Sequence, residues 1–331
     1  MPTSPGSSKD TDWRPSASVE TLRLRARLLE RTRAFFAARG LLEVETPQLS
    51  AAAATDLHLE SLVAQRPGGA PLGWLHTSPE FPMKRLLAAG IGDAWQLARV
   101  FRGGERGPRH NPEFTLLEWY RVGWDAAALM DEVEAFVRAL AGDEWMPGEA
   151  QRLSYRDAFL CHAGFDPFAA DPGEVLRCLA GQGVAVPGDL GDDLDACLDL
   201  ALATVVEPRL EPARPTFIYD FPASHAALAR IRPGEPPVAE RFELFLGGME
   251  IANGFHELTD AGEQAARFEA DLARRRVRGL VEPPIDGRLL AAMSHGLPDC
   301  AGVALGFDRL VMVLAGATRI DEVLAFPWGH C

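Results

Sequence analysis

Lysine is nearly absent from this chain of 331 residues: 33 residues are Lys or Arg, yet only Lys9 and Lys84 are lysines. The phosphate-binding loop of P-loop nucleotidases requires a lysine directly after a glycine. Lys9 follows Ser8 and Lys84 follows Met83. The sequence therefore excludes this way of binding ATP.

Cysteine motifs and uninterrupted apolar runs are missing as well. The five cysteines are widely spaced and form no Cys-x-x-Cys pair, so neither a structural zinc site nor a disulfide framework is expected. The longest apolar run, residues 300–317, is interrupted by Asp308 and Arg309 and does not predict a membrane span. The Ser/Pro-rich N-terminus lacks the apolar region of a signal peptide. We therefore expect a cytoplasmic protein that does not associate with membranes.

Positive charge is also in deficit, since 47 acidic residues outnumber the 33 basic ones and give a net charge of −14. Nucleic-acid phosphates attract surfaces rich in Lys and Arg, so we expect no DNA partner and regard tRNA as a poor one. A small charged substrate remains compatible with a cationic pocket in an acidic surface. His256-Glu257 lacks the second histidine of a His-Glu-x-x-His zinc site, and no Gly-x-Ser-x-Gly motif occurs.

Hydrophobic periodicity and turn residues predict the organisation of the chain. Residues 1–17 are small and polar and are expected to be a disordered tail. Residues 151–210 are punctuated by Pro and Gly, carry no chemical motif and are predicted to be a helical insertion. The other expected elements are a helix from Ser18 to Gly40, a strand over 42–46, strands over 94–101 and 113–120 joined by a loop at 102–112, a helix over 125–141, and a strand that passes into a helix over 301–315.

Residues 241–252 predict a β-hairpin, because Gly247-Gly248 is a two-residue turn signal between two apolar segments. Folding at this turn places Glu243 opposite Ala252. Glu243 and Glu250 then lie on one face as diagonal neighbours, roughly 7–8 Å apart at the backbone, where two carboxylates can share a divalent cation. A solvated hairpin face explains the same pattern equally well.

Several further charged residues are of the types that bind phosphates and ammonium groups. Arg102 and Arg309 flank Gly-rich turns, as contacts to phosphates do, while Glu80, Glu118 and Glu257 lie near aromatic or glycine residues and can hold an ammonium group. With the two hairpin carboxylates as Mg²⁺ ligands, the set suits a nucleoside triphosphate, a metal ion and a cationic small molecule. Each residue alone is more often a partner in a surface salt bridge, so the inference depends on the joint pattern.

Five segments resemble motifs of class II aminoacyl-tRNA synthetases in their lysyl form. The stretch FRGGERGPRHNPEFTLLEWY resembles motif 2, AGVALGFDRL motif 3 and LLEVETPQLS motif 1, and HTSPEFPMKRLL and MEIANGFHELTD resemble lysine-pocket segments. The resemblance covers residues 18–326. About 20 residues precede the first helix, so no anticodon-binding OB-fold domain is expected. A stand-alone lysyl-type core is similar to the family of ligases that attach (R)-β-lysine to elongation factor P.

This resemblance implies an α+β class II catalytic domain over residues 18–331, with an antiparallel sheet of six to seven strands flanked by helices. It also implies a homodimer formed through motif 1. The implied activity is that of an ATP-dependent ligase with ATP as co-substrate and Mg²⁺ as cofactor. The enzyme would activate β-lysine, or lysine, as an adenylate and transfer it to a lysine side chain of elongation factor P. Arginines and Mg²⁺ would stabilise the charge that develops on the α-phosphate.

The resemblance also implies roles for individual residues. Arg102 would contact the α-phosphate and the substrate carboxylate, and Arg309 would hold the γ-phosphate, so these two arginines are the expected catalytic residues. Glu243 and Glu250 would bind Mg²⁺, and Glu250 would also contact ATP. The other expected ATP-binding residues are Glu105, His110, Asn111, Ile251, Gly306 and Phe114, which would stack under adenine. The expected substrate-binding residues are Ser78, Pro79, Glu80, Glu118, Tyr120, Asn253, Glu257 and Ala304.

Two positions depart from the lysyl pattern. Motif 2 usually contains Arg-x-Glu, but Gly104 stands at the position of the glutamate, and we hypothesise that Glu105 takes over the contact of that glutamate with ATP. Lysyl-tRNA synthetases typically have glycine where this chain has Ala304. Because one methyl group in a pocket wall changes discrimination by about 1–3 kcal/mol, we expect Ala304 to favour β-lysine over α-lysine.

Two alternatives remain open. One is a truncated lysyl-tRNA synthetase paralogue that charges tRNA or makes dinucleotide signals, against which the expected lack of an anticodon domain and the net charge argue. The other is a non-catalytic regulatory paralogue. Gly104 favours that alternative, whereas the retained arginines and the two expected metal-binding glutamates disfavour it.

Overall fold

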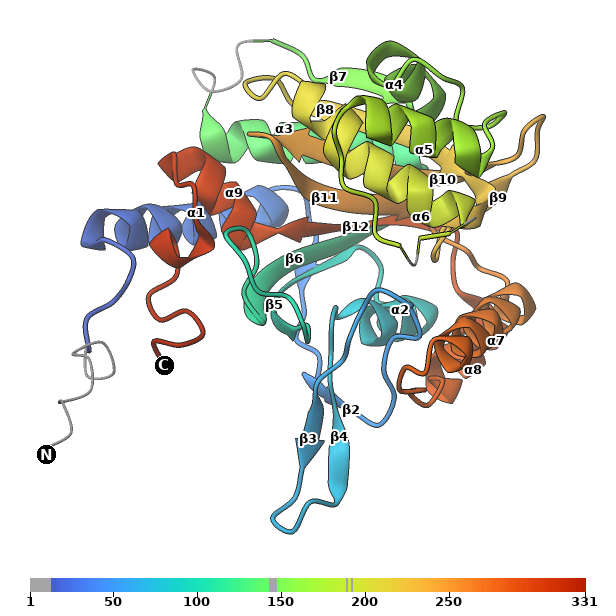
Figure 1. The fold of residues 1–331 in the computed structure, drawn as a ribbon. Coiled ribbons are helices and arrows are strands. Elements are labelled where there is room, and N and C mark those ends of the chain that lie inside the picture. Colours follow the sequence, from blue (N-terminus) through green and yellow to red (C-terminus); the bar gives the residue numbers. More distant parts are fainter. Residues whose placement is uncertain (1–12, 143–147, 189, 192) are drawn as a thin grey trace, which may run out of the picture.

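Figure 1 shows the computed structural model of the chain, which describes residues 13–142, 148–188, 190–191 and 193–331. Most of the tail expected over residues 1–17 lies outside the described residues. Ser16 and Ala17 donate backbone hydrogen bonds to Ala325 and Leu324, at 2.9 and 3.2 Å. The expectation of disorder was therefore wrong for these two residues, because they are docked on the C-terminal segment.

A mixed sheet forms the centre of the molecule. In the described part of the chain it has nine strands, in the order β1-β5-β6-β12-β11-β10-β8-β7, with β9 paired to β10. The strands are β1 (Leu42–Glu43), β5 (Ala94–Phe101), β6 (Glu113–Val122), β7 (Gln151–Ser154), β8 (Thr216–Pro222), β9 (Ile231–Arg232), β10 (Val238–Leu246), β11 (Met249–His256) and β12 (Cys300–Gly306).

The α+β architecture is confirmed, but the expected antiparallel sheet of six or seven strands was wrong at both edges. The six central strands, β5, β6, β12, β11, β10 and β8, pair antiparallel with their neighbours. The edge strand β1 pairs parallel with β5, and the edge strand β7 pairs parallel with β8. Each edge strand is joined to its neighbour by a long connection that contains at least one helix, and such crossovers bring strands together in parallel.

The predicted strands agree better with the structure at the centre of the sheet than at its edges. β5 matches the strand expected over 94–101, and β6 extends the one expected over 113–120 by two residues. The strand expected over 42–46 was too long, because only β1 is formed. One further backbone bond, from Val44 N to Trp95 O at 2.9 Å, follows it. Pro47, which has no N–H for a ladder, then closes the segment.

The predicted β10–β11 hairpin is confirmed, with a different register. Gly247 and Gly248 form the turn at positive φ, 65° and 69°, as a primed turn requires. The ladder shifts between Leu244 and Phe245, so Glu243 lies opposite Asn253 and not opposite Ala252. Ile251 of β11 has no partner in the ladder and forms a β-bulge. The predicted register was counted residue by residue from the turn and therefore did not include this extra residue.

One face of the sheet is covered by α1 (Val19–Ala37), α3 (Ala126–Ala141) and α9 (Phe307–Ala315), which match the expected helices. The Ser18 side chain caps α1 by accepting from Thr21 N at 3.1 Å. The core on this face contains Phe36 stacked on Trp95, with ring centroids 4.8 Å apart. A face filled in this way leaves no room for a substrate.

The opposite face carries more loosely arranged elements. Helices α2 (Glu80–Ala88), α7 (Ala261–Val277) and α8 (Gly287–Gly296) share an apolar cluster, and Figure 1 shows α7 and α8 side by side. Strands β2 (Leu49–Ser50), β3 (Val63–Gln65) and β4 (Pro71–Leu75) form a small separate sheet that projects from the body of the molecule. None of the described helices combines the length and apolar character of a membrane span.

The segment expected to be a helical insertion begins with a strand. Residues 151–154 form β7, and Ser154 caps the following helix by accepting from Asp157 N at 3.0 Å, which is why helix formation starts only at residue 155. The segment then forms α4 (Tyr155–His162), α5 (Pro172–Gly181), α6 (Leu194–Ala201), the π-helix η1 (Leu202–Val206) and the 3-10 helix η2 (Glu207–Arg209). Its apolar cluster includes Ile218 of β8 and Phe245 of β10, so it packs on the sheet. Its status as an insertion stays a prediction. Two further 3-10 helices of the described residues are η3 (Ala223–His225) and η4 (Ile320–Glu322).

Candidate active site

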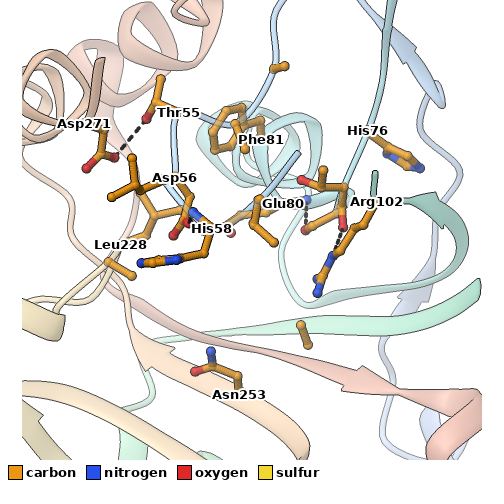
Figure 2. A pocket seen from close by; sticks show the side chains of 18 of the residues that line it. Thr55, Asp56, His58, His76, Glu80, Phe81, Arg102, Leu228, Asn253 and Asp271 are labelled. Atoms are coloured by element: carbon orange, nitrogen blue, oxygen red, sulfur yellow. Dashed lines mark hydrogen bonds between the residues drawn. The ribbon is translucent and has the colours of Figure 1, made fainter. Parts of the chain in front are cut away.

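A cavity of about 880 Å³ lies over the sheet face opposite α1, α3 and α9. Arg102, Arg309, Glu243 and Glu250 all line it. Figure 2 shows Glu80, Arg102 and Asn253 around this space, with Thr55 and its partner Asp271 on another side. The four residues expected to handle the triphosphate therefore share one cavity, although they come from three distant stretches of the sequence.

Cross-strand pairing explains how the cavity floor is assembled. Gln96 on β5 lies opposite Glu118 on β6, Glu118 opposite Ala304 on β12, Ala304 opposite Asn253 on β11, and Asn253 opposite Glu243 on β10. Directly opposed residues point to the same face of a sheet. Five strands thus present one row of mainly polar side chains away from the aromatic core.

The loop between β5 and β6 brings Arg102 to the edge of the cavity. Its Nε donates to Thr77 O at 3.3 Å, and its NH1 lies 3.5 Å from Glu105 Oε1. Its guanidinium carbon is 5.0 Å from the ring centroid of Phe114. A cation, an acid and an aromatic ring therefore meet here, and all three side chains line the cavity.

Two glycines in this loop are packed against a residue that the sequence did not single out. Gly104 has a φ of 73°, in the left-handed region. A Cβ at Gly103 would lie 2.7 Å from Glu60 Cδ, and one at Gly104 would lie 3.5 Å from Glu60 Oε2. Glu60 thus occupies space beside the position where motif 2 usually has a glutamate. Glu60 does not line the cavity, whereas Glu105 does.

Arg309 lies at the start of α9 between two partners. Its NH1 donates to Glu250 O at 2.9 Å and lies 3.5 Å from Glu250 Oε2, and its NH2 lies 2.7 Å from His110 Nε2. Burial, and next the charge of Arg309, lower the pKa of His110, so its neutral ring can accept from the guanidinium. The preceding Asp308 is buried, accepts from Thr115 N at 2.7 Å and pairs with Arg25. Asp308 therefore fixes the start of the helix that carries Arg309.

Glu243 and Glu250 form a pair of carboxylates on the hairpin. Glu243 pairs with Arg241, which also donates to Asn253 Oδ1 at 3.2 Å. Burial raises the pKa of Glu243 to about 7; Arg241 opposes this rise and the charge of Glu250 adds to it. Within the described residues, no group of three or more His, Cys, Asp or Glu could hold a metal. A cation at this pair would therefore need further oxygen ligands from its substrate, as Mg²⁺ takes from phosphates.

The carboxylates expected to bind an ammonium group lie at different depths. Ser78 and Glu80 line the cavity, whereas Pro79, Glu118, Tyr120 and Glu257 do not. Glu118 accepts from Ser78 Oγ at 2.8 Å and from Tyr120 OH at 2.6 Å. Glu118 and Glu257 are 2% and 1% exposed. The structure therefore puts two of the three expected acids beneath the cavity wall, while their roles stay predictions.

Lys84 is a site residue that the sequence analysis missed. It is 1% exposed, and its Nζ lies 2.7 Å from Glu80 Oε1 and 2.6 Å from Glu257 Oε2. Two acids expected to bind the substrate are thus already paired with a cation of the chain. The spacing of Glu80 and Lys84, four residues apart on α2, was the available signal.

Other wall residues gave no sequence signal. Asp195 and Asp199 of α6 line the cavity together with His225. The His225 Nε2 lies 3.5 Å from Asp195 Oδ1 and 3.7 Å from Asp199 Oδ1. The segment over 151–210, which shows no chemical motif, therefore contributes acidic side chains to the cavity.

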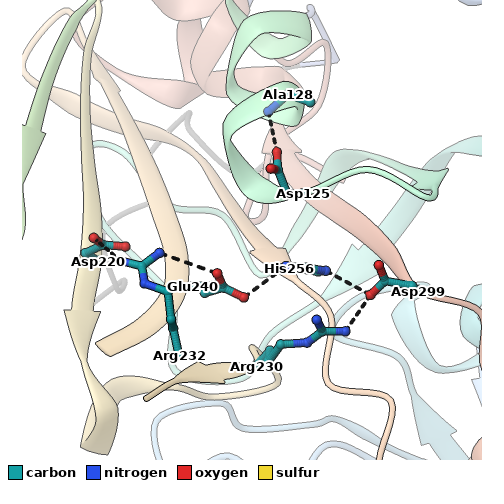
Figure 3. Close-up of polar contacts among 8 residues, drawn as sticks. All are labelled: Asp125, Ala128, Asp220, Arg230, Arg232, Glu240, His256 and Asp299. Carbon is teal, nitrogen blue, oxygen red and sulfur yellow. Dashed lines mark hydrogen bonds and ion pairs between the residues drawn. The ribbon is translucent and has the colours of Figure 1, made fainter. Parts of the chain in front are cut away.

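A histidine network holds the end of β11, where Glu257 follows. Figure 3 shows His256 between two acids: its Nδ1 is 2.9 Å from Glu240 Oε2 and its Nε2 is 2.9 Å from Asp299 Oδ1. Asp299 also pairs with Arg230. Because Glu240 is on β10 and Asp299 precedes β12, the network ties three neighbouring strands together beside Glu257.

Comparisons with known proteins give the family of the chain. Residues 8–329 match the family model described as tRNA synthetases class II (D, K and N). The chain is 49% identical over 323 residues to an elongation factor P–(R)-β-lysine ligase of Vibrio cholerae, with 96% of this chain and 98% of the relative covered. The protein of that name from Vibrio vulnificus is 49% identical over 321 residues, with 96% and 98% covered. The one from Yersinia enterocolitica is 48% identical over 327 residues, with 98% and 99% covered.

Proposed function

The chain belongs to the class II tRNA synthetases (D, K and N) and, within them, to the family of elongation factor P–(R)-β-lysine ligases, and we propose that it activates (R)-β-lysine with ATP and transfers it to a lysine side chain of elongation factor P. The observation that supports this best is the cavity that Arg102, Arg309, Glu243 and Glu250 share. Two cations and two acids around one space suit a triphosphate and its metal ion.

The first step is adenylation of the substrate carboxylate. One carboxylate oxygen attacks the α-phosphorus of ATP, the bond from that phosphorus to the bridging oxygen breaks, and pyrophosphate leaves. Arg102 would bind the carboxylate and the α-phosphate, and Arg309 would bind the outer phosphates in place of Glu250 and His110. Once bound to the phosphates, the two cations stabilise the charge that develops at the α-phosphate and so lower the barrier.

Mg²⁺ fits the hairpin pair by ligand chemistry. Carboxylate oxygens are the ligands that Mg²⁺ prefers, and it commonly takes one or two of them together with substrate phosphates. Glu243 is 7% exposed and its pKa is raised to about 7, so the pocket disfavours its charge until a cation arrives. When bound, the ion would neutralise phosphate charge. Glu243 and Glu250 would hold it, and Arg241 would keep Glu243 oriented.

The second step forms the amide. The neutral ε-amine of the acceptor lysine attacks the acyl carbon of the adenylate, the bond to the phosphate oxygen breaks, AMP leaves, and the amine loses a proton. No residue of the chain needs to act as a covalent nucleophile. Ser78 and Glu80 at the wall, with Glu118 behind them, would hold the ammonium groups of the substrate by charge-assisted hydrogen bonds.

Pyrophosphate exchange and intact mass test the proposal. The purified chain with Mg²⁺-ATP should exchange pyrophosphate when (R)-β-lysine or lysine is added. Elongation factor P incubated with the chain, ATP and β-lysine should gain the mass of one lysyl unit. Exchange followed by charging of tRNA and not of elongation factor P would favour the synthetase paralogue. No exchange with either amino acid would favour a regulatory paralogue.

We also expect a homodimer that works in the cytoplasm, where ATP and translation factors are found. Leu42, Leu49, Val63 and Leu72, on β1 and the small projecting sheet, are 40–51% exposed. Exposed apolar side chains on these strands support an interface between copies of the chain. Light scattering on the purified chain should give the mass of a dimer.

A further inference from the structure

A charge imbalance is built into the floor of the substrate pocket. Three carboxylates, Glu80, Glu118 and Glu257, meet one ammonium group, Lys84. Lys84 contacts Glu80 and Glu257, at 2.7 and 2.6 Å, and leaves Glu118 to the hydroxyls of Ser78 and Tyr120. Fully ionised, the cluster carries a net charge of about −2 by this count of one cation against three acids.

Burial makes this imbalance expensive. Lys84, Glu118 and Glu257 are at most 2% exposed, and an isolated buried charge is strongly disfavoured. Burial, and next the charge of Glu80, raise the pKa of Glu118 to about 8. Burial also raises the pKa of Glu257 to about 7, although Lys84 opposes the rise. The empty pocket therefore holds protons that a cationic ligand would displace.

No other cation of the described residues contacts the cluster. The further groups that face it are the Tyr120 phenol on β6, the Ser78 hydroxyl before α2 and the Cys300 thiol on β12, and none of these is cationic. A Cβ at Gly302 of β12 would lie 2.3 Å from the Tyr120 ring and 2.5 Å from Glu257 Oε1. The Tyr120 ring and Glu257 thus fill the space over Gly302, and further positive charge at the cluster comes either from bound protons or from the ligand.

We propose that Lys84 is a positioning residue that sets the charge of the substrate pocket: it cancels one of three clustered carboxylates and leaves two, which match a substrate with two ammonium groups. The inference rests on the proposed function, since (R)-β-lysine and lysine carry two ammonium groups. Lys84 bridges Glu80 at the cavity wall and Glu257 beneath it, and so holds the wall carboxylate in place. It does not itself touch the reacting atoms.

Replacement of Lys84 by methionine tests the proposal, because methionine has a similar shape and no charge. Without the bridge, Glu80 and Glu257 repel each other and take up protons, so the Michaelis constant for (R)-β-lysine should rise roughly 30-fold or more. The Michaelis constant for ATP should stay within about twofold of the original. Arg121→Met is the matched control. It also removes a buried cation between two acids, Glu132 and Asp93, but on the opposite face of β6.

A charge-restoring double variant separates charge balance from loss of structure. Glu257→Gln alone leaves too little negative charge and should also weaken binding of (R)-β-lysine. Combined with Lys84→Met it leaves Glu80 and Glu118, again two acids without a compensating lysine. The double variant should therefore bind (R)-β-lysine at least about tenfold more tightly than Lys84→Met, a non-additive result expected only of interacting groups.

The pH dependence gives a second readout. In the original chain the Michaelis constant for (R)-β-lysine should fall as pH rises through about 8, because Glu118 loses its proton to make room for an ammonium group. In Lys84→Met this fall should move to higher pH, since the acids lose a stabilising cation. Calorimetry in two buffers of different ionisation enthalpy should detect the released proton.

The outcomes are distinct from those that test the proposed function. If the original chain exchanges no pyrophosphate with either diamino acid, the proposed function itself is wrong. If it does, three results would overturn the role of Lys84: an unchanged Michaelis constant in Lys84→Met, an equal loss in Arg121→Met, or a double variant weaker than both single ones.

Discussion

We predict that Glu105 takes the place of the glutamate that motif 2 usually contains. It lines the cavity and lies 3.5 Å from the Arg102 guanidinium. Glu105→Ala removes both a carboxylate that can face ATP and the partner that orients Arg102. A hydrogen bond to a charged group is worth about 1.5–3 kcal/mol, so the Michaelis constant for ATP should rise at least about tenfold.

Steady-state kinetics with varied ATP measure this effect. Glu113→Ala is the control, because Glu113 lies just beyond the same loop, is exposed and sits 3.9 Å from Arg99. An ATP Michaelis constant that is equal in both variants would refute the hypothesis that Glu105 substitutes for the missing glutamate.

Ala304 is the single methyl group in the row that crosses the cavity floor. It lies between its cross-strand partners Glu118 and Asn253 and lines the cavity. Ala304→Gly would open space for the α-amino group of lysine. One methyl group is worth about 1–3 kcal/mol in discrimination, so the preference for β-lysine over α-lysine, as a ratio of kcat/KM, should fall about tenfold.

Competition between the two amino acids in pyrophosphate exchange measures this ratio. Ala301→Gly, three residues away on the same strand and therefore on the opposite face, is buried in the core and controls for loss of stability. No change in the ratio would show that Ala304 does not select the substrate.

At the scale of elements, the β10–β11 turn offers a matched pair of glycines. Gly247 and Gly248 have nearly equal positive φ, 65° and 69°, so a side chain at either is strained by about 1–2 kcal/mol. A Cβ at Gly247 would also lie 2.8 Å from Val313 Cγ2 of α9, whereas one at Gly248 meets nothing within 4 Å. Gly247→Ala should therefore cost about 1–3 kcal/mol more than Gly248→Ala.

Urea denaturation of the two variants measures the difference in the free energy of unfolding. The extra loss at Gly247 reports the contact between the hairpin and α9, the helix that carries Arg309. Equal losses would mean that the hairpin and α9 adjust to each other freely.

The elements show how far sequence can predict this fold. The segments AWQLARVF and EFTLLEWY predicted β5 and β6 correctly because both strands are long and rich in apolar residues. β1 and β7 have two and four residues, too few for a periodic signal, and their pairing is set by distant partners. The bulge at Ile251 was not predicted, because the residues of a turn determine only the first pairs of a hairpin.

The candidate site also could be predicted from the sequence only in part. Motif likeness selected Arg102, Arg309, Glu243 and Glu250, and the structure brings them to one cavity. It could not tell that Glu118 and Glu257 lie beneath the wall, because depth depends on how side chains from α2 and β12 pack together. Lys84 was not predicted as a site residue, because its second partner, Glu257, is 173 residues away in the sequence.

At the scale of the whole molecule, the two faces of the sheet differ in polarity. One is filled by aromatic rings under α1, α3 and α9 and holds the strands rigidly. The other buries carboxyl groups whose pKa values are raised by burial, and functional sites commonly hold groups with shifted pKa values. The stability of the empty protein should therefore depend on pH through residues that serve the substrate.

Glu118 gives the sign of this dependence. Its pKa is raised from 4.5 to about 8 in the folded chain, by burial and then by the charge of Glu80. Between these two values the folded state holds a proton that the unfolded state has lost, so the free energy of unfolding falls as pH rises from about 5 to above 8. Glu118→Gln removes the carboxyl group that binds this proton, so its contribution to the pH dependence is lost. From pH 6 to 8.5 the melting temperature of the original chain should fall about 2–4 °C more than that of the variant.

Thermal melts across this range, without ATP or amino acid, measure the two slopes. Glu113→Gln changes an exposed carboxylate on the same strand and should keep the slope of the original chain. Added (R)-β-lysine should stabilise the original chain more at pH 8.5 than at pH 6, because its ammonium groups take the place of the lost proton and binding to the folded state raises stability. Parallel slopes for the original chain and Glu118→Gln would mean that Glu118 is already ionised in the empty pocket, and that its negative charge is balanced before any substrate arrives.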